Sequence, residues 1–375
     1  MRAVFITIIA LVASIRIAHA YPQFQLIKDQ TCSSCHLSPA GGGLLSENGY
    51  AVAESISQFG TAPEFMYKKV PLPDWLQLGG DFRGAGGYDA AGANKDPVVF
   101  PMQAEIYARA TYKNFTLHVT AGLRDPEYQT GSPGYVPATL VGSREHYLQW
   151  QSDEGSSNGV FVRVGRFMPV FGLRFAEHPY YDRRYGGTPL YGETYAAAVE
   201  YVQPKYEVHL TGFVPDPLID AIELGKGATL YAEARLDDKT AVGIEGKLDF
   251  QDTDNRYYGG ITAKRAITGD ILAQGEIEYI HDVFDGGHEN QLVGTAVGSY
   301  LIGPAMIDLG LNYFRQKLDT SLLDLEAVDL NVHWFGTSHL ELILANRYQT
   351  QAFGANAAIG QAAVYYSLLM VHYRL

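Results

Sequence analysis

The chain ends with Leu369-Met370-Val371-His372-Tyr373-Arg374-Leu375, a stretch whose side chains alternate in character. Every second residue from Leu369 to Leu375 is apolar or aromatic, and Met370, His372 and Arg374 stand between them. Because successive side chains of a strand point to opposite faces, one face of this stretch is an unbroken apolar stripe. A stripe that reaches the terminus in this way predicts a strand sealed against lipid.

The same alternation recurs through residues 75–375, in segments of about ten residues separated by turns. We therefore predict an all-β fold, a transmembrane antiparallel β-barrel of about sixteen strands, an even number as bacterial barrels require. The predicted strands are Leu76–Tyr88, Met102–Tyr112, Phe115–Leu123, Arg144–Gln151, Val160–Phe167, Thr194–Val202, Tyr206–Val214, Ala228–Leu236, Ala241–Phe250, Arg256–Arg265, Ile271–His281, Gln291–Ile302, Met306–Arg315, Leu325–Trp334, Leu340–Tyr348 and Ala362–Leu375.

The connections between these strands alternate in length. Every second one is short, such as Lys113-Asn114 and Gly303-Pro304, and the others are mostly longer, such as Arg124–Ser143 and Met168–Glu193. Short periplasmic turns and long extracellular loops produce this alternation, so both ends of the barrel are predicted on the periplasmic side. Met168–Glu193 carries arginines and tyrosines, and it either folds inward, where arginines favour anions, or forms a solvated loop with salt bridges.

The first twenty residues predict a secretory signal peptide. Arg2 precedes an apolar run, and Ala18-His19-Ala20 ends it before Tyr21. The chain has 28 basic and 41 acidic residues, and removal of Arg2 and Arg16 leaves 26, a charge of about −15 (26 − 41). This acidic balance excludes a nucleic-acid binder, which needs a basic footprint.

Residues 21–74 contain the two cysteines of the chain, in Cys32-Ser33-Ser34-Cys35-His36. This spacing is the attachment signature of c-type haem: both thiols bind the porphyrin covalently and His36 is the proximal iron ligand. A redox-active Cys-x-x-Cys would need a thioredoxin-like βαβ context, and a zinc site would need two more ligands nearby. Neither is visible, which leaves a chance match as the remaining alternative. A short helix is predicted over Ser46–Phe59, with Ser46 as its cap.

The sixth iron ligand has several candidates. Met66 is the only methionine of residues 21–74, although methionine is also ordinary packing. By the alternation of the strands, five histidines face the barrel interior near its periplasmic end: His118, His209, His333, His339 and His372. One of them could bind the iron or hold haem propionates, and His333, His339 and His372 are the subset to test first. Histidine as a polar filler of the lumen is the simpler interpretation for each.

A haem motif followed by a barrel of about sixteen strands resembles the fused monohaem cytochrome–porins of iron-oxidising bacteria. The architectural resemblance covers the whole mature chain, and the matching residues are Pro22-x-Phe24, the Cys32–His36 motif and Gly49-Tyr50. Where that family tends to show Pro-Phe-Gly-Arg after the haem, this chain has Ser38–Gly43, which leaves iron as the donor open. Val164–Gly172 is similar to the strand-and-loop signature of phosphate-selective-type porins, which supports the barrel class.

The motif and the resemblance together imply one covalent haem c in a barrel surrounded by outer-membrane lipid. They imply single-electron transfer between an extracellular donor or acceptor, Fe(II) among them, and a periplasmic cytochrome or other electron carrier. The corresponding enzyme class is an iron:cytochrome c oxidoreductase, with no catalytic acid, base or nucleophile because the iron does the chemistry. The alternative is a diffusion porin whose haem segment is a plug or redox sensor. A third, weaker possibility is peroxide chemistry, which needs an open sixth site.

Overall fold

The structure is a computed structural model that describes residues 35–38, 44–56, 64–89, 98–124, 140–177, 179–189, 192–215, 225–317, 322–354 and 360–375. The predicted signal peptide (1–20) and Cys32 lie outside the described residues. The described part of residues 21–74 contains α4 (Glu47–Ile56) and the short 3-10 helix η1 (Phe65–Lys68). Among the described helices, none has the length and apolarity needed to cross a membrane.

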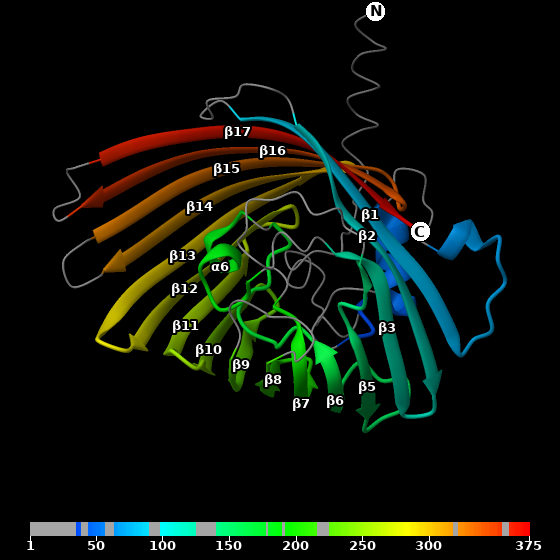
Figure 1. Cartoon of the computed structure of the whole chain (residues 1–375). Helices are drawn as coiled ribbons and strands as arrows, with labels where there is room; N and C mark the ends of the chain where they lie inside the picture. Colours follow the sequence, from blue (N-terminus) through cyan, green and yellow to red (C-terminus); the bar gives the residue numbers. More distant parts are fainter. Residues whose placement is uncertain are drawn as a thin grey trace, which may run out of the picture.

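The strands form one closed antiparallel barrel (Figure 1). Each strand pairs with its neighbour along the chain, and β17 (Gly360–Arg374) pairs back onto β1 (Leu76–Asp89), so the described sheet has no free edge. β4 (Leu140–Gly142) and β5 (His146–Gln151) both pair with β3 (Phe115–Arg124), so they are two parts of one strand. The 17 strand segments of the sheet therefore make sixteen strands around the barrel (17 − 1).

The other strands lie close to the predicted ranges, and the prediction of about sixteen strands is confirmed. They are β2 (Val98–Tyr112), β6 (Gly159–Phe167), β7 (Thr194–Gln203), β8 (Tyr206–Val214), β9 (Lys226–Asp237), β10 (Thr240–Phe250), β11 (Asp254–Ala266), β12 (Ile271–Phe284), β13 (Gly287–Ile302), β14 (Ala305–Lys317), β15 (Leu322–Thr337) and β16 (Leu340–Gly354).

The predicted strand ranges leave residues 282–290 between two strands, where the structure has a tight hairpin. β12 runs to Phe284 and β13 starts at Gly287, so that only Asp285 and Gly286 join them. Gly286 has φ +93°, a conformation that glycine adopts without the steric cost of a Cβ. The backbone ladder therefore continues past the alternating residues from which the strand ends were predicted.

The burial pattern is inverted relative to a water-soluble sheet. On β14, Leu309 and Leu311 are 49% and 52% exposed, whereas Asp308 and Asn312 are 0% and 5% exposed. Apolar side chains therefore cover the outside of the barrel and polar ones fill its lumen. Because the closed sheet pairs its backbone groups internally, such a wall can lie in hydrocarbon.

The long connection between β6 and β7 folds into the barrel. It carries α6 (Tyr181–Arg184), which packs against β13 and β14 and is enclosed by the strands in Figure 1. Of the two alternatives left open for Met168–Glu193, the structure shows the inward-folded one.

Candidate functional site

Cys35, the described cysteine of the predicted haem-attachment motif, packs against α4. The Ser46 hydroxyl accepts a hydrogen bond from the Gly49 N–H at 3.1 Å, so the predicted helix cap is confirmed. A Cβ on Gly49 would lie 2.0 Å from the carbonyl oxygen of Cys35. Glycine is required at this position because the first helical turn lies against the motif, and this contact positions Cys35 relative to α4.

The same segment contacts the start of the barrel. His36 pairs with Leu45 in an isolated antiparallel bridge. The neighbouring Leu44 occupies the space over Gly79 of β1, where a Cβ would lie 2.8 Å from Leu44 Cδ2. Gly79 therefore leaves room for this segment, and the chain that carries His36 lies at the end of the barrel where β1 begins.

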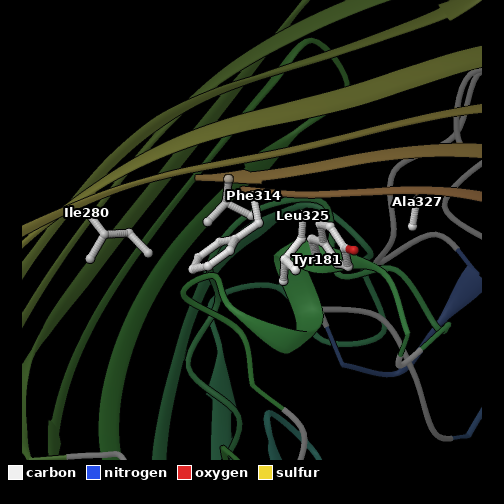
Figure 2. Packing of buried hydrophobic residues seen from close by; sticks show 6 residues of the cluster. Tyr181, Ile280, Phe314, Leu325 and Ala327 are labelled. Atoms are coloured by element: carbon white, nitrogen blue, oxygen red, sulfur yellow. The ribbon is translucent and has the colours of Figure 1, made fainter. Parts of the chain in front are cut away.

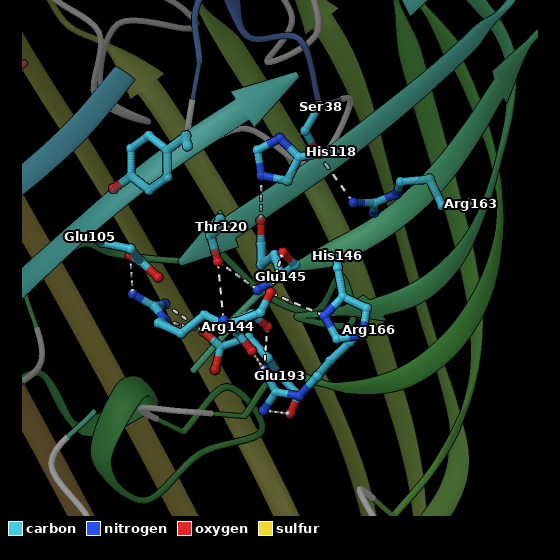
Figure 3. Close-up of polar contacts among 12 residues, drawn as sticks. Ser38, Glu105, His118, Thr120, Arg144, Glu145, His146, Arg163, Arg166 and Glu193 are labelled. Atoms are coloured by element: carbon cyan, nitrogen blue, oxygen red, sulfur yellow. Dashed lines mark hydrogen bonds and ion pairs between the residues drawn. The ribbon is translucent and has the colours of Figure 1, made fainter. Parts of the chain in front are cut away.

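A hydrogen bond ties Ser38 to the lumen wall. Arg163 of β6 donates from Nη1 to the hydroxyl of Ser38, two residues beyond His36, at 3.2 Å (Figure 3). In the same view His118 points toward Glu145, and its Nε2 lies 3.6 Å from the carboxylate. The His118 ring stacks on Tyr147 with a centroid distance of 4.9 Å. Ser38 thus lies inside the barrel, against β6.

The predicted inward orientation of the five histidines is confirmed, since these residues are between 0% and 5% exposed inside a barrel with an apolar exterior. His209 lies between two carboxylates, with Nδ1 3.2 Å from Glu200 and Nε2 3.6 Å from Glu207. Both ring nitrogens therefore face carboxylates, and the three side chains form a buried ion network.

His333 and His372 share a carboxylate network. Glu341 accepts from Nδ1 of His333 at 2.9 Å and from Nδ1 of His372 at 3.0 Å. The Nε2 atom of His372 contacts Asp81 at 2.7 Å, and that of His333 lies 3.5 Å from Asp308. Both ring nitrogens of each histidine therefore face carboxylates, and a proton held between a ring nitrogen and a carboxylate occupies the lone pair that an iron ion would need.

His339 has a different environment. It is 1% exposed, and its Nδ1 lies 2.8 Å from the carbonyl oxygen of Arg374. Its buried Nε2 has no hydrogen-bond partner among the residues that the structure describes. The ring of Tyr67 in η1 lies over it, with 4.0 Å between ring centroids. Met66, the neighbour of Tyr67, is 41% exposed.

The inward-folded loop packs against apolar side chains of the lumen wall. Tyr181 packs against Phe314 and Leu325, which point into the barrel toward α6 (Figure 2). Polar contacts fix the same loop: the Tyr181 N–H donates to Asn312 Oδ1 at 2.9 Å, and the Gly187 N–H donates to Glu278 Oε2 at 2.8 Å. The loop is therefore a packed constriction of the lumen.

Acidic groups of this loop titrate near neutrality. Burial raises the pKa of Glu177 to about 7, with the His333 imidazole opposing the rise and Asp308 adding to it. Burial also raises the pKa of Asp182 to about 6, against the attraction of Arg183. Because folding raises both pKa values, these groups favour the docked loop at low pH, and that contribution is lost as the pH rises through 6 to 7.

Among the described residues of the lumen, two side-chain groups have donor atoms close enough to share a cation. Glu177, Asp308 and His333 form one, and Glu245, Glu276 and Glu278 the other, with all donor atoms within 4.8 Å of one another. The first group combines imidazole with carboxylates and suits a transition metal, whereas the second offers oxygen alone. Without a metal ion, Glu177 and Asp308 of the first group serve as counter-charges to His333.

Sequence reasoning missed the residues that surround these histidines. Glu341, Asp81 and Arg109 were not singled out, although each alternates with outward-facing neighbours and could have been assigned to the lumen by period two. Alternation identifies the face of the sheet but not which lumen residues meet across strands far apart in the sequence.

Comparison with known proteins supports the barrel architecture. No protein-family model and no curated protein matches the chain. OmpT of Vibrio cholerae has a similar structure, with a TM-score of 0.60 at 15% identity over 82% of this chain and 100% of that one. An anion-selective porin from Comamonas acidovorans gives 0.61 at 12% identity over 80% and 99%. OprB of Pseudomonas putida gives 0.57 at 10% identity over 80% and 94%. The chain thus has the fold of bacterial outer-membrane porins.

Proposed function

We propose that this outer-membrane porin-like barrel carries single electrons across the membrane by means of one haem c, held by Cys32, Cys35 and His36. When bound, the haem supplies a one-electron iron couple. The observation that supports the proposal most directly is the hydrogen bond from Arg163 to Ser38, at 3.2 Å. It holds Ser38 against the lumen wall, so that the barrel separates this site from lipid.

The described residues fit a covalent haem. Cys35 and His36 offer the sulfur and imidazole that attachment requires, and α4 packs on Cys35 through Gly49. The buried Nε2 of His339 has no hydrogen-bond partner among the described residues, while its Nδ1 is fixed by a carbonyl oxygen. A histidine that binds a metal commonly has this arrangement, with one nitrogen oriented by a carbonyl group and the other toward the metal.

His339 is therefore our choice for the sixth ligand, ahead of Met66, His333 and His372. We expect His339→Gln to convert a low-spin haem spectrum into a high-spin one, because glutamine does not replace imidazole as a strong-field ligand. The absorption spectrum of the purified protein measures this change. His209→Gln, another buried inward histidine, is the matched control and should keep the low-spin bands. Unchanged bands in His339→Gln would rule out this ligand and leave Met66→Leu as the next variant.

The electron-transfer proposal is tested in lipid vesicles that contain the purified protein. Fe(II) is added outside, and a soluble c-type cytochrome trapped inside reports electrons that cross. A second set of vesicles contains an Fe(II) chelator, which reports ions that pass through the lumen. We expect reduction of the cytochrome without a chelator signal. Reduction that only accompanies iron entry would contradict the proposal.

The second candidate function is a diffusion porin with a haem-bearing plug, and the porin-like fold favours it. Conductance in a planar bilayer separates the two. An open ohmic channel whose conductance does not change with the redox state of the haem supports the plain porin, whereas a nearly closed barrel supports the conduit.

A further inference from the structure

Arg109 is a buried cation whose hydrogen-bond partners are neutral. Its side chain on β2 is 9% exposed, and its guanidinium donates to Gln77 Oε1 at 3.4 Å and to Thr116 Oγ1 at 3.3 Å. Among the described residues, its Nε has no hydrogen-bond partner and no carboxylate forms an ion pair with it. Burial removes the hydration of a guanidinium, so that an anion beside it is expected.

Gln149, on β5, also has buried polar atoms that lack hydrogen-bond partners among the described residues. It is 1% exposed, and neither atom of its amide group has a hydrogen-bond partner among the described residues. Gln149 lies opposite Thr116 of β3 and opposite Arg163 of β6 in the strand register. It therefore stands between Arg163 and Thr116, the residue to which Arg109 donates.

Arg163 completes the group. It is 2% exposed, and it uses Nη2 for Glu200 and Nη1 for Ser38, while its Nε has no hydrogen-bond partner in the described chain. The donors of Arg109, Gln149 and Arg163 line one part of the lumen wall. Guanidinium and amide N–H groups are the donors that recognise a carboxylate, and a planar guanidinium does so with two parallel bonds.

We propose that Arg109, Gln149 and Arg163 form a carboxylate-binding site, and that its ligand is a propionate group of the haem. This assignment rests on the proposed function, because it requires a haem attached at Cys35. The position supports it: Ser38, bonded to Arg163 at 3.2 Å, is two residues beyond His36. Two residues span at most about 7 Å, so that the haem ligand and the site belong to one small region.

The test compares Arg109→Gln with Arg235→Gln in the haem-loaded, full-length protein. Arg235 is the matched control, since it lies on the lumen-facing period of β9 near the same end of the barrel. We expect equal haem attachment in both. In Arg109→Gln, the redox equilibrium should shift at least tenfold toward the oxidised form, a fall of 59 mV in midpoint potential, because a positive charge beside the haem is lost. The potential should also become pH-dependent near neutrality, since a propionate without its cation binds protons more readily.

Resonance Raman spectra provide a readout that does not depend on electron transfer. The propionate bending band should shift in Arg109→Gln and in Gln149→Leu, and stay in place in Arg235→Gln. Arg109→Lys keeps the charge but not the planar fork, so it should restore most of the potential while the band remains shifted. This variant also tests the site if Arg109→Gln fails to assemble.

The outcomes separate this inference from the proposed function. A protein without covalent haem refutes the proposed function itself. Attached haem with the same potential and Raman band in Arg109→Gln and in Arg235→Gln overturns the propionate site alone. Free acetate serves as the probe for a solute in the site: thermal stabilisation of the haem-loaded wild type that is lost in Arg109→Gln would also overturn the propionate assignment.

Discussion

Replacing Cys32 and Cys35 together by alanine should abolish covalent haem and electron transfer and leave the barrel assembled. Thioether bonds to these two sulfurs are the only covalent attachment that the chain offers, since it has no other cysteine. The barrel is stabilised by its own pairing, in which β17 closes onto β1 without the motif. Haem stain after denaturing electrophoresis should therefore be lost completely, whereas the circular dichroism of the sheet should be unchanged.

Ser33→Ala with Ser34→Ala is the matched control for this variant. It changes two residues within the same motif and keeps both thiols, so that haem stain should remain at the wild-type level. A stained band in the double cysteine variant would show that the haem is attached elsewhere. Loss of the folded barrel in that variant would instead show that the motif contributes to assembly.

Shortening the inward loop should raise the conductance of the barrel several-fold. We suggest replacing residues 176–188 by a short Gly-Ser linker, which removes α6 and the packing of Tyr181 on Phe314 and Leu325. The space that these side chains fill in the lumen would then be open to water and ions, because pore cross-section limits the flow. Single-channel recording in a planar bilayer measures the change.

Arg184→Gln is the control for the loop. Arg184 is an exposed residue of α6, so its replacement removes a charge without removing the packed constriction, and the conductance should stay close to that of the wild type. If the shortened variant conducts no better than the wild type, the lumen is closed by another segment. The haem spectrum of the shortened variant should match that of the wild type, since Cys35 and His36 do not belong to the loop.

The barrel could be predicted because its signals are local. Alternating side chains identify each strand, and the two-residue period gives the face of each histidine, which the structure confirms for all five. The hairpin at Asp285-Gly286 was missed because the alternation loses its apolar contrast beyond the lipid band, although the backbone continues to pair. Apolar residues that face inward, such as Phe314 and Leu325, were also not anticipated. These two side chains pack against Tyr181 of the inward loop, which is more than a hundred residues away in the sequence.

The candidate site was only partly predictable. The motif Cys32–His36 is recognisable by spacing, and the cap at Ser46 by residue type. The choice among the histidines was not, because it depends on what each ring nitrogen meets. Glu341 reaches both His333 and His372, whereas a carbonyl oxygen of Arg374 orients His339. These partners come from different strands, and no local pattern relates them.

The sequence by itself determined the kind of wall this protein builds, its number of strands and the chemistry expected at its cysteines, because side-chain alternation and ligand spacing are encoded in neighbouring residues. Only the tertiary structure decided which loop fills the lumen, and which inward histidine keeps a buried nitrogen that meets neither a hydrogen-bond partner nor a carboxylate among the described residues. It also decided that Gln149 lies opposite both the arginine that holds Ser38 and the threonine to which Arg109 donates. Closure of the barrel is the physical reason. It brings strands from both ends of the chain around one enclosed space, where burial and charge act between residues that the sequence keeps apart.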